Sequence, residues 1–175
     1  YHRVPKTRVE NLEYRKEIYT RCAKDAAFRK AVWIACSRDT LYFFNTFLWV
    51  YEPRPGMPCG QGKLPFITWP HQDRALTTLD RWWGLRDVRF WKTRGEGATW
   101  MVSMRQLKDW LFEPAYRPAA FGIVTRNEET VDSPDDSDSI MWKLDWQLKQ
   151  LPKWMVPPFN RKVSEHSLKN EDTDS

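Results

Sequence analysis

In the centre of the chain, two short apolar segments flank one long amphipathic segment, and this order limits how the region can fold. Residues 87–91 alternate and are rich in strand-forming side chains, and residues 121–125 form a second short apolar run. Residues 98–112 between them have the spacing of one helix face. That face consists of Trp100, Met104, Leu107 and Leu111. The order strand, helix, strand predicts a βαβ unit with parallel strands.

Two helices are predicted before this unit. Residues 8–31 place small and apolar side chains at the three- and four-residue spacing of one helix face. Residues 38–51 are apolar on nearly every side, which is typical of a helix that is buried or awaits a partner. Asp39 or Ser37 can cap the start of this second helix. The chain therefore predicts a helical N-terminal segment, residues 1–52.

A segment rich in proline and glycine, residues 53–65, separates this helical segment from the rest. Such a composition favours a linker loop. A short extended segment at 66–69 follows, and then a helix at 71–83 that Gly84 ends. Residues 66–175 are predicted to form the second part of the chain, a partial α/β domain.

Two polar features follow the second apolar run. Residues 127–139 are acidic and favour a solvated loop, because they lack the Gly and Glu positions of a helix-loop-helix calcium site. Asp138 can cap a helix over residues 139–150, which Pro152 ends.

The amino-acid composition limits the cellular environment and the binding partners expected for the chain. The 11 Trp are more than 175 residues need for a core, and large rings also serve as stacking surfaces. The formal net charge of +5 is compatible with a polyanion such as DNA. Three widely spaced cysteines, Cys22, Cys36 and Cys59, predict reduced thiols and no zinc site. The most apolar run, residues 41–50, is too short to span a bilayer, so no membrane partner is expected.

The segment between the first predicted strand and its helix suits phosphate binding. Gly95 and Gly97 permit the backbone angles that turn amide hydrogens inward, and the helix start presents N–H groups that lack intrahelical acceptors. Thr99 stands where a phosphate loop needs a hydroxyl for Mg²⁺. Ala98 occupies the position of the usual lysine. A tight structural turn without a ligand would require the same glycines.

The segment around these glycines is Lys92-Thr93-Arg94-Gly95-Glu96-Gly97-Ala98-Thr99-Trp100. It resembles a variant phosphate loop of bacteriophage terminase large subunits, Lys-Ser-Arg-x-x-Gly-x-Ser/Thr-Trp, with Thr93 in place of Ser. The variant carries its lysine at the front of the loop. The resemblance implies that these nine residues bind ATP, that Lys92 neutralises the β and γ phosphates, and that Thr99 holds Mg²⁺. Arg94 would contact phosphate or act as a catalytic arginine finger, or it could pair with an acidic neighbour instead.

Two further segments are similar to the same family. Residues 66–72 resemble its adenine-reading motif, which implies that the amide of Gln72 pairs with the adenine edge. Residues 121–132 resemble the family's strand that ends in Ser-Arg and is followed by an acidic pair and Val-Asp. This resemblance implies that Arg126 reaches the nucleotide or a neighbouring subunit. With smaller similarities on either side, the resemblance covers most of residues 35–160.

The family implies a P-loop NTPase-like three-layer sheet, here partial, behind the helical segment. It implies an ATP-driven motor that moves double-stranded viral DNA into a procapsid, in a protein that also cleaves DNA. The motor would be a homo-oligomeric ring that works with a portal protein and a small terminase subunit in the host cytoplasm. No apolar strand ending in Asp-Glu follows residue 160. The chain is therefore expected to stop before its Walker B and nuclease carboxylates and to have no turnover alone.

Two other functions remain open at this point. A different P-loop enzyme, such as a helicase, would share the strand–loop–helix unit but should carry Gly-Lys-Ser/Thr. In a Trp-rich DNA-binding or interaction module, the glycine turn would have only a structural role and the chain would bind no nucleotide.

Overall fold

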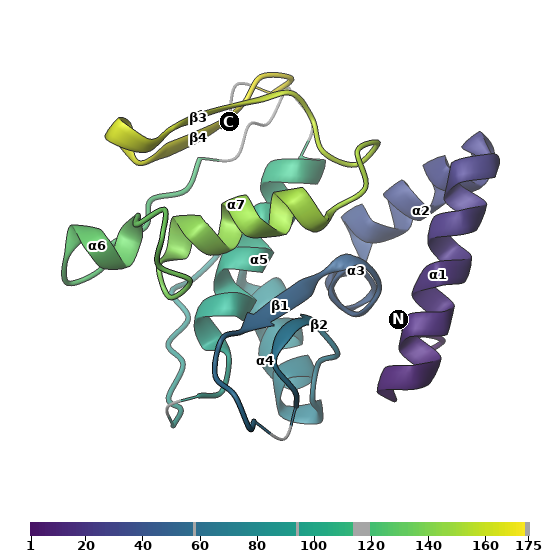
Figure 1. Cartoon of the computed structure of the whole chain (residues 1–175). Coiled ribbons are helices and arrows are strands. Elements are labelled where there is room, and N and C mark those ends of the chain that lie inside the picture. The colour runs from purple at the N-terminus through teal and green to yellow at the C-terminus, as the bar shows by residue number, and fades with distance from the viewer. Residues whose placement is uncertain (58, 94, 114–119, 174–175) are drawn as a thin grey trace. The chain divides into compact units, whose positions relative to one another are not determined.

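The computed structural model describes residues 1–57, 59–93, 95–113 and 120–173 (Figure 1). This part of the chain is mixed α/β, with two small antiparallel two-stranded sheets. It divides into two compact units. Unit 1 contains residues 1–48 and 65–102, and unit 2 contains residues 49–64 and 103–175. Each unit thus combines two separate stretches of the chain.

Three helices form the front of unit 1. They are α1 (Arg8–Lys24), α2 (Ala26–Arg38) and α3 (Thr40–Phe47). The single helix expected over 8–31 is interrupted at Asp25, whose backbone is extended. The Asp25 carboxylate accepts a hydrogen bond from the N–H of Phe28 at 2.9 Å. A residue that caps one helix does not continue the previous one, so the expectation of a single helix is wrong at this point.

Helix α3 is the buried helix that its apolar surface predicts. Its expected cap is confirmed, because the Asp39 carboxylate accepts from the N–H of Tyr42 at 2.9 Å. Its three phenylalanines have no exposed surface: Phe43, Phe44 and Phe47. The helix ends at Phe47, and the chain continues as strand β1 (Trp49–Glu52). The expected helical run to residue 51 is therefore too long by about one turn.

The two later helices of the central region lie close to their predicted positions. Helix α4 spans Pro70–Trp82, and helix α5 spans Ala98–Phe112. Pro70 begins α4 because the first turn of a helix needs no N–H from that position. Gly84 follows α4 with φ of +69°. No helix in the described part of the chain is both long enough and apolar enough to cross a membrane.

The predicted βαβ unit is not formed by the described residues. Neither 87–91 nor 121–125 is a strand, although helix α5 lies between them in the chain. A segment with strand propensity becomes a strand only when a neighbour pairs its backbone N–H and C=O groups. The sheets that the described residues do form pair strands close in sequence, β1 with β2 and β3 with β4. The three-layer sheet expected from the family is therefore not seen in this structure.

Unit 2 contains both hairpins. Strand β2 (Gly62–Pro65) lies within the segment that was expected to be a linker loop, and it pairs with β1. Near the C-terminus, β3 (Phe159–Lys162), the short helix η1 (Val163–Glu165) and β4 (Ser167–Asn170) form the second hairpin. Its register pairs the ends of the two strands, Phe159 with Asn170 and Lys162 with Ser167.

Unit 2 has one helix inside the predicted solvated loop and one directly after it. Helix α6 (Glu128–Val131) lies inside that acidic segment, and helix α7 (Ile140–Gln150) comes after it. The expected cap of α7 is wrong by one residue. The hydroxyl of Ser139, not the carboxylate of Asp138, accepts from the N–H of Trp142, at 3.3 Å. Ser139 is the extended residue directly before the first helical residue, which is the position that a capping side chain requires.

Aromatic residues join β1 to α7 within unit 2. The rings of Trp142 and Trp146, one helical turn apart, are stacked with centroids 5.9 Å apart. Tyr51 of β1 contacts both rings, at 5.4 and 5.9 Å. The N–H of Trp49 donates to the side-chain oxygen of Gln147 at 2.9 Å. These tryptophans therefore have a packing role between a strand and a helix.

Candidate functional site

A polar network in unit 1 positions the start of α4. The ammonium group of Lys6 donates to the side chain of Asn45 at 3.0 Å and to the hydroxyl of Thr68 at 2.7 Å. It also pairs with the carboxylate of Asp73 at 3.1 Å. Burial lowers the pKa of Lys6, and the adjacent Asp73 carboxylate opposes that effect. The network ties the first residues of the chain to α3 and to the first turn of α4.

Gln72 in the first turn of α4 links this helix to the glycine-rich loop. Its side-chain oxygen accepts from the N–H of Trp69 at 3.0 Å, which satisfies a donor at the helix start. Its amide nitrogen donates to the backbone carbonyl of Glu96 at 3.1 Å. Gln72 is only 6% exposed. Both ends of its amide are therefore used inside unit 1, and neither is directed to a ligand in this conformation.

The loop itself has the backbone conformation that its glycines predict. Gly95 and Gly97 have φ of +91° and +72°. A Cβ at residue 97 would lie 3.1 Å from the amide nitrogen of Gln72. Gly97 is therefore required both for its positive φ and for the close approach of Gln72. Its carbonyl accepts from the N–H of Met101 at 2.9 Å, so helix α5 begins directly after the loop.

The carboxylate of Glu96 is held from two sides. One oxygen accepts from the hydroxyl of Thr93 at 3.0 Å, and the other lies 2.9 Å from Nε2 of His71. The His71 and Glu96 side chains are 43% and 36% exposed, so this pair faces solvent in part. The loop thus contains a negatively charged side chain, Glu96, close in sequence to the first N–H groups of α5, which carry partial positive charge.

The predicted site residues differ in where they lie, and Gly95 is exposed within the loop. The structure brings together Gln72, Thr93, Glu96 and Gly97. Lys92, before the two glycines in the sequence, and Thr99, after them, are exposed. Ala98 and Trp100 are half-buried in the first turn of α5. Arg94 lies outside the described residues. Arg126 is exposed in unit 2.

Sequence reasoning missed the contact between His71 and Glu96. His71 was expected to be an ordinary surface histidine, and Glu96 was included only as a member of the loop. The pair joins residues 25 positions apart, and nothing in their spacing predicts it. The one available signal was the position of His71 next to Gln72, because adjacent residues in a first helical turn can both reach a neighbouring loop.

In chemical terms, the arrangement is a helix N-terminus preceded by a glycine-rich loop with an exposed lysine and an exposed threonine hydroxyl. Helix N-termini and inward-facing loop amides bind phosphate groups. Among the described residues, no cluster of three or more His, Cys, Asp or Glu side chains could hold a metal ion. A cation at this loop would therefore depend on Thr99 and on the phosphates themselves. Comparison with protein families, with curated proteins and with solved structures gives no match.

Replacing Gln72 is expected to loosen the loop. Gln72→Ala removes both of its hydrogen bonds and should lower the free energy of unfolding by about 1–2 kcal/mol. Gln72→Glu keeps the acceptor for Trp69 but loses the donor to Glu96, so it should affect the loop and spare α4. Heteronuclear NOE values of Gly95 and Gly97 measure the effect. Unchanged values in Gln72→Glu would show that the contact does not hold the loop.

Proposed function

We propose that the chain is the nucleotide-binding part of a terminase-like DNA-packaging motor, an ATPase. In this proposal Lys92 and the loop amides of residues 93–98 bind the phosphates of ATP, and Thr99 holds Mg²⁺. Gln72 reads adenine, and Trp100 completes the nucleotide-binding segment. Arg94 contacts phosphate or acts as the catalytic arginine. The proposal also includes the partial P-loop NTPase-like sheet that the family resemblance implies.

The observation that carries the proposal is the hydrogen bond between the side chain of Gln72 and the carbonyl of Glu96. Two motifs that resemble the same family, 24 residues apart in sequence, touch in unit 1. A purely structural turn does not need a glutamine at the start of the preceding helix. A nucleotide whose adenine and phosphates bind at the two motifs requires that they lie close together.

Reading of adenine requires a change at Gln72. Both ends of its amide are engaged within the chain, and an adenine edge needs one donor and one acceptor. The base would have to replace the bond to Glu96 or the bond to Trp69. Nucleotide binding is therefore expected to shift the backbone amide signals of Trp69 and Gly97 in an NMR spectrum.

The wider function belongs to the proposal too. The parent protein would form a homo-oligomeric ring, drive double-stranded DNA into a procapsid and cleave DNA with a separate nuclease site. Its partners would be a portal protein and a small terminase subunit, in the host cytoplasm. The formal net charge of +5 agrees with a polyanionic substrate.

A second candidate is a Trp-rich DNA-binding or interaction module. The side chain of Trp91, directly before the loop, is fully exposed, and that of Trp69 is 53% exposed. Exposed aromatic rings beside basic residues stack on bases or dock on protein partners. Under this alternative the glycine turn only connects Trp91 to α5.

Lys92→Ala separates the two candidates. The motor proposal predicts that the chain binds MgATP and that this variant binds it about ten- to hundredfold more weakly, equivalent to about 1.5–3 kcal/mol. Lys30→Ala, which removes an exposed charge from α2, is the matched control and should bind as the unaltered chain does. Isothermal titration calorimetry measures all three. No MgATP binding by any of them, together with intact DNA binding, would favour the module.

A further inference from the structure

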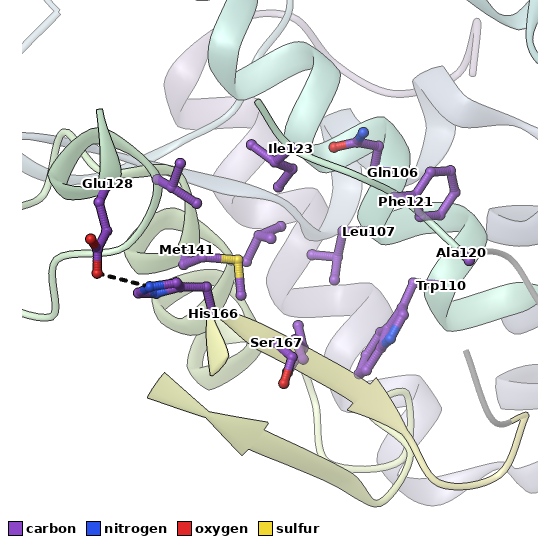
Figure 2. A pocket seen from close by; sticks show the side chains of 13 residues that line it. Gln106, Leu107, Trp110, Ala120, Phe121, Ile123, Glu128, Met141, His166 and Ser167 are labelled. Carbon is purple, nitrogen blue, oxygen red and sulfur yellow. Dashed lines mark hydrogen bonds and ion pairs between the residues drawn. The ribbon is translucent and has the colours of Figure 1, made fainter. Parts of the chain in front are cut away.

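Unit 2 contains a pocket of about 490 Å³ that is lined mainly by apolar side chains (Figure 2). Helices α5 and α7 contribute Leu107, Trp110, Met141 and Leu144. Ile123 and Val131 come from the segment that leads into α6 and from α6 itself. Glu128 and His166 lie together at one side of the pocket, joined by the contact drawn in Figure 2.

His166 connects the hairpin β3–β4 to α6. It lies between η1 and β4 in the left-handed backbone region, with φ of +50°. Its Nε2 lies 3.0 Å from a carboxylate oxygen of Glu128, the first residue of α6. Its Nδ1 lies 3.1 Å from a carboxylate oxygen of Asp132, the residue that ends α6. The imidazole therefore bridges the two ends of one short helix.

The two contacts together require a protonated ring. An ionised carboxylate only accepts hydrogen bonds, and a neutral imidazole has a single N–H to donate. Both ring nitrogens face carboxylate oxygens, so only the imidazolium form donates to both. Loss of the second proton must break one of the two contacts.

The surrounding charges determine which contact is lost. Asp132 is held independently by Arg161, whose guanidinium donates to it at 2.6 Å and also pairs with Asp145 at 2.9 Å. Lys162 and Glu165, on the turn side of the hairpin, pair with each other at 3.0 Å. The Glu128 side chain is 78% exposed. The contact between His166 and Glu128 is therefore the weaker of the two and the one expected to open.

We propose that protonation of His166 closes a latch between the hairpin β3–β4 and α6, and that the closed latch shuts one side of the apolar pocket. When the ring is neutral, Glu128 separates from His166, and α6 with the segment before it moves away from the hairpin. The pocket then admits apolar aromatic molecules from solvent. This inference is independent of any nucleotide at the glycine-rich loop.

The direction of the pH dependence follows from the same contacts. The hydrogen bond to Asp132 and, to a smaller extent, that to Glu128 raise the pKa of His166 above its ordinary value of 6.5, against the opposing effect of desolvation. A histidine whose pKa is raised in the folded state stabilises that state fully below its unfolded pKa. That stabilisation is lost as the pH rises through the folded pKa. The latch should therefore be closed at mildly acid pH and open at mildly alkaline pH.

The latch is tested in the full chain with Glu128→Gln and a matched control, Glu129→Gln. Both variants remove one exposed acid from α6, but the contact to His166 belongs to Glu128. An NMR titration of the His166 ring should show a lower pKa in Glu128→Gln than in the unaltered chain or in Glu129→Gln. Equal pKa values in all three proteins would overturn the proposal.

Pocket access has a separate readout, the fluorescence of N-phenyl-1-naphthylamine, an uncharged aromatic dye whose binding does not depend on the net charge of the chain. The unaltered chain and Glu129→Gln should show a severalfold rise in dye fluorescence between about pH 5 and pH 8. Glu128→Ala leaves no side-chain group to pair with His166 and should be bright at both pH values, because its latch cannot close. His166→Asn tolerates the left-handed backbone but is too short to bridge both carboxylates, and it should give the same result. Dye fluorescence that is independent of pH in the unaltered chain would rule out control of the pocket by this histidine.

Discussion

Replacing Arg15 by Met is expected to destabilise unit 1 by about 3 kcal/mol, because it removes buried hydrogen bonds from a charged donor. The Arg15 side chain on α1 is buried, with 2% of its surface exposed. Its guanidinium donates to the backbone carbonyls of Leu48 at 2.9 Å and Asn45 at 2.8 Å, and to the side chain of Asn11 at 2.7 Å. Burial lowers the pKa of Arg15 to about 10.

The size of this effect follows from where the carbonyls lie. The last carbonyl groups of α3 have no partner within their own helix, and Arg15 supplies donors to them from α1. Methionine fills a similar volume but donates no hydrogen bond. The carbonyl of Leu48 would keep only the N–H of Phe66, and that of Asn45 only the side-chain amide of Asn11. Each buried carbonyl would lose its charged donor, and no water could replace it.

Urea denaturation followed by far-ultraviolet circular dichroism measures the change. Lys16→Met is the matched control, because Lys16 is the next residue of α1 and is exposed. That control should change stability by less than about 0.5 kcal/mol. A similar loss in both variants would mean that Arg15 acts through helix propensity or overall charge and not through the carbonyls.

Asp132→Ala should destabilise unit 2 by about 3 kcal/mol. Only 1% of the Asp132 side chain is exposed, and it accepts from Arg161 and contacts His166. Removal leaves Arg161, 12% exposed, with Asp145 as its remaining carboxylate partner. The expected loss therefore lies at the lower end of the range for breaking a buried ion pair.

This loss should be visible as a lower unfolding midpoint of the β3–β4 hairpin signals in NMR spectra recorded with increasing urea. Asp135→Ala provides the control, since Asp135 is an exposed acid in the same segment. If Asp132→Ala and Asp135→Ala unfold at the same urea concentration, the buried network does not hold the hairpin.

The two predictions concern different units of the chain. Arg15 joins α1 to the end of α3 in unit 1, 33 residues away at Leu48, and Asp132 joins α6 to the C-terminal hairpin in unit 2, 29 residues away at Arg161. Neither residue belongs to the candidate site. Their variants therefore report on the scaffold, while Lys92→Ala and Gln72→Glu report on the loop.

Local patterns in the sequence determined several elements correctly. Helix α5 follows from its apolar spacing, and the end of α4 follows from Gly84. The Asp39 cap of α3 follows from a side chain that accepts a hydrogen bond from a backbone N–H three residues later. The positive φ angles of Gly95 and Gly97 also follow from local chemistry. Each of these features depends on residues within about four positions of one another, so composition and spacing were sufficient.

Tertiary structure decided the features that depend on distant partners. Residues 87–91 and 121–125 have strand propensity, but a strand needs a neighbour to pair its backbone, and the described residues provide none for them. The contacts of Gln72 with Glu96 and of His166 with Asp132 join residues 24 and 34 positions apart. Spacing along the chain carries no information about such contacts, because they form only after helices and hairpins have packed.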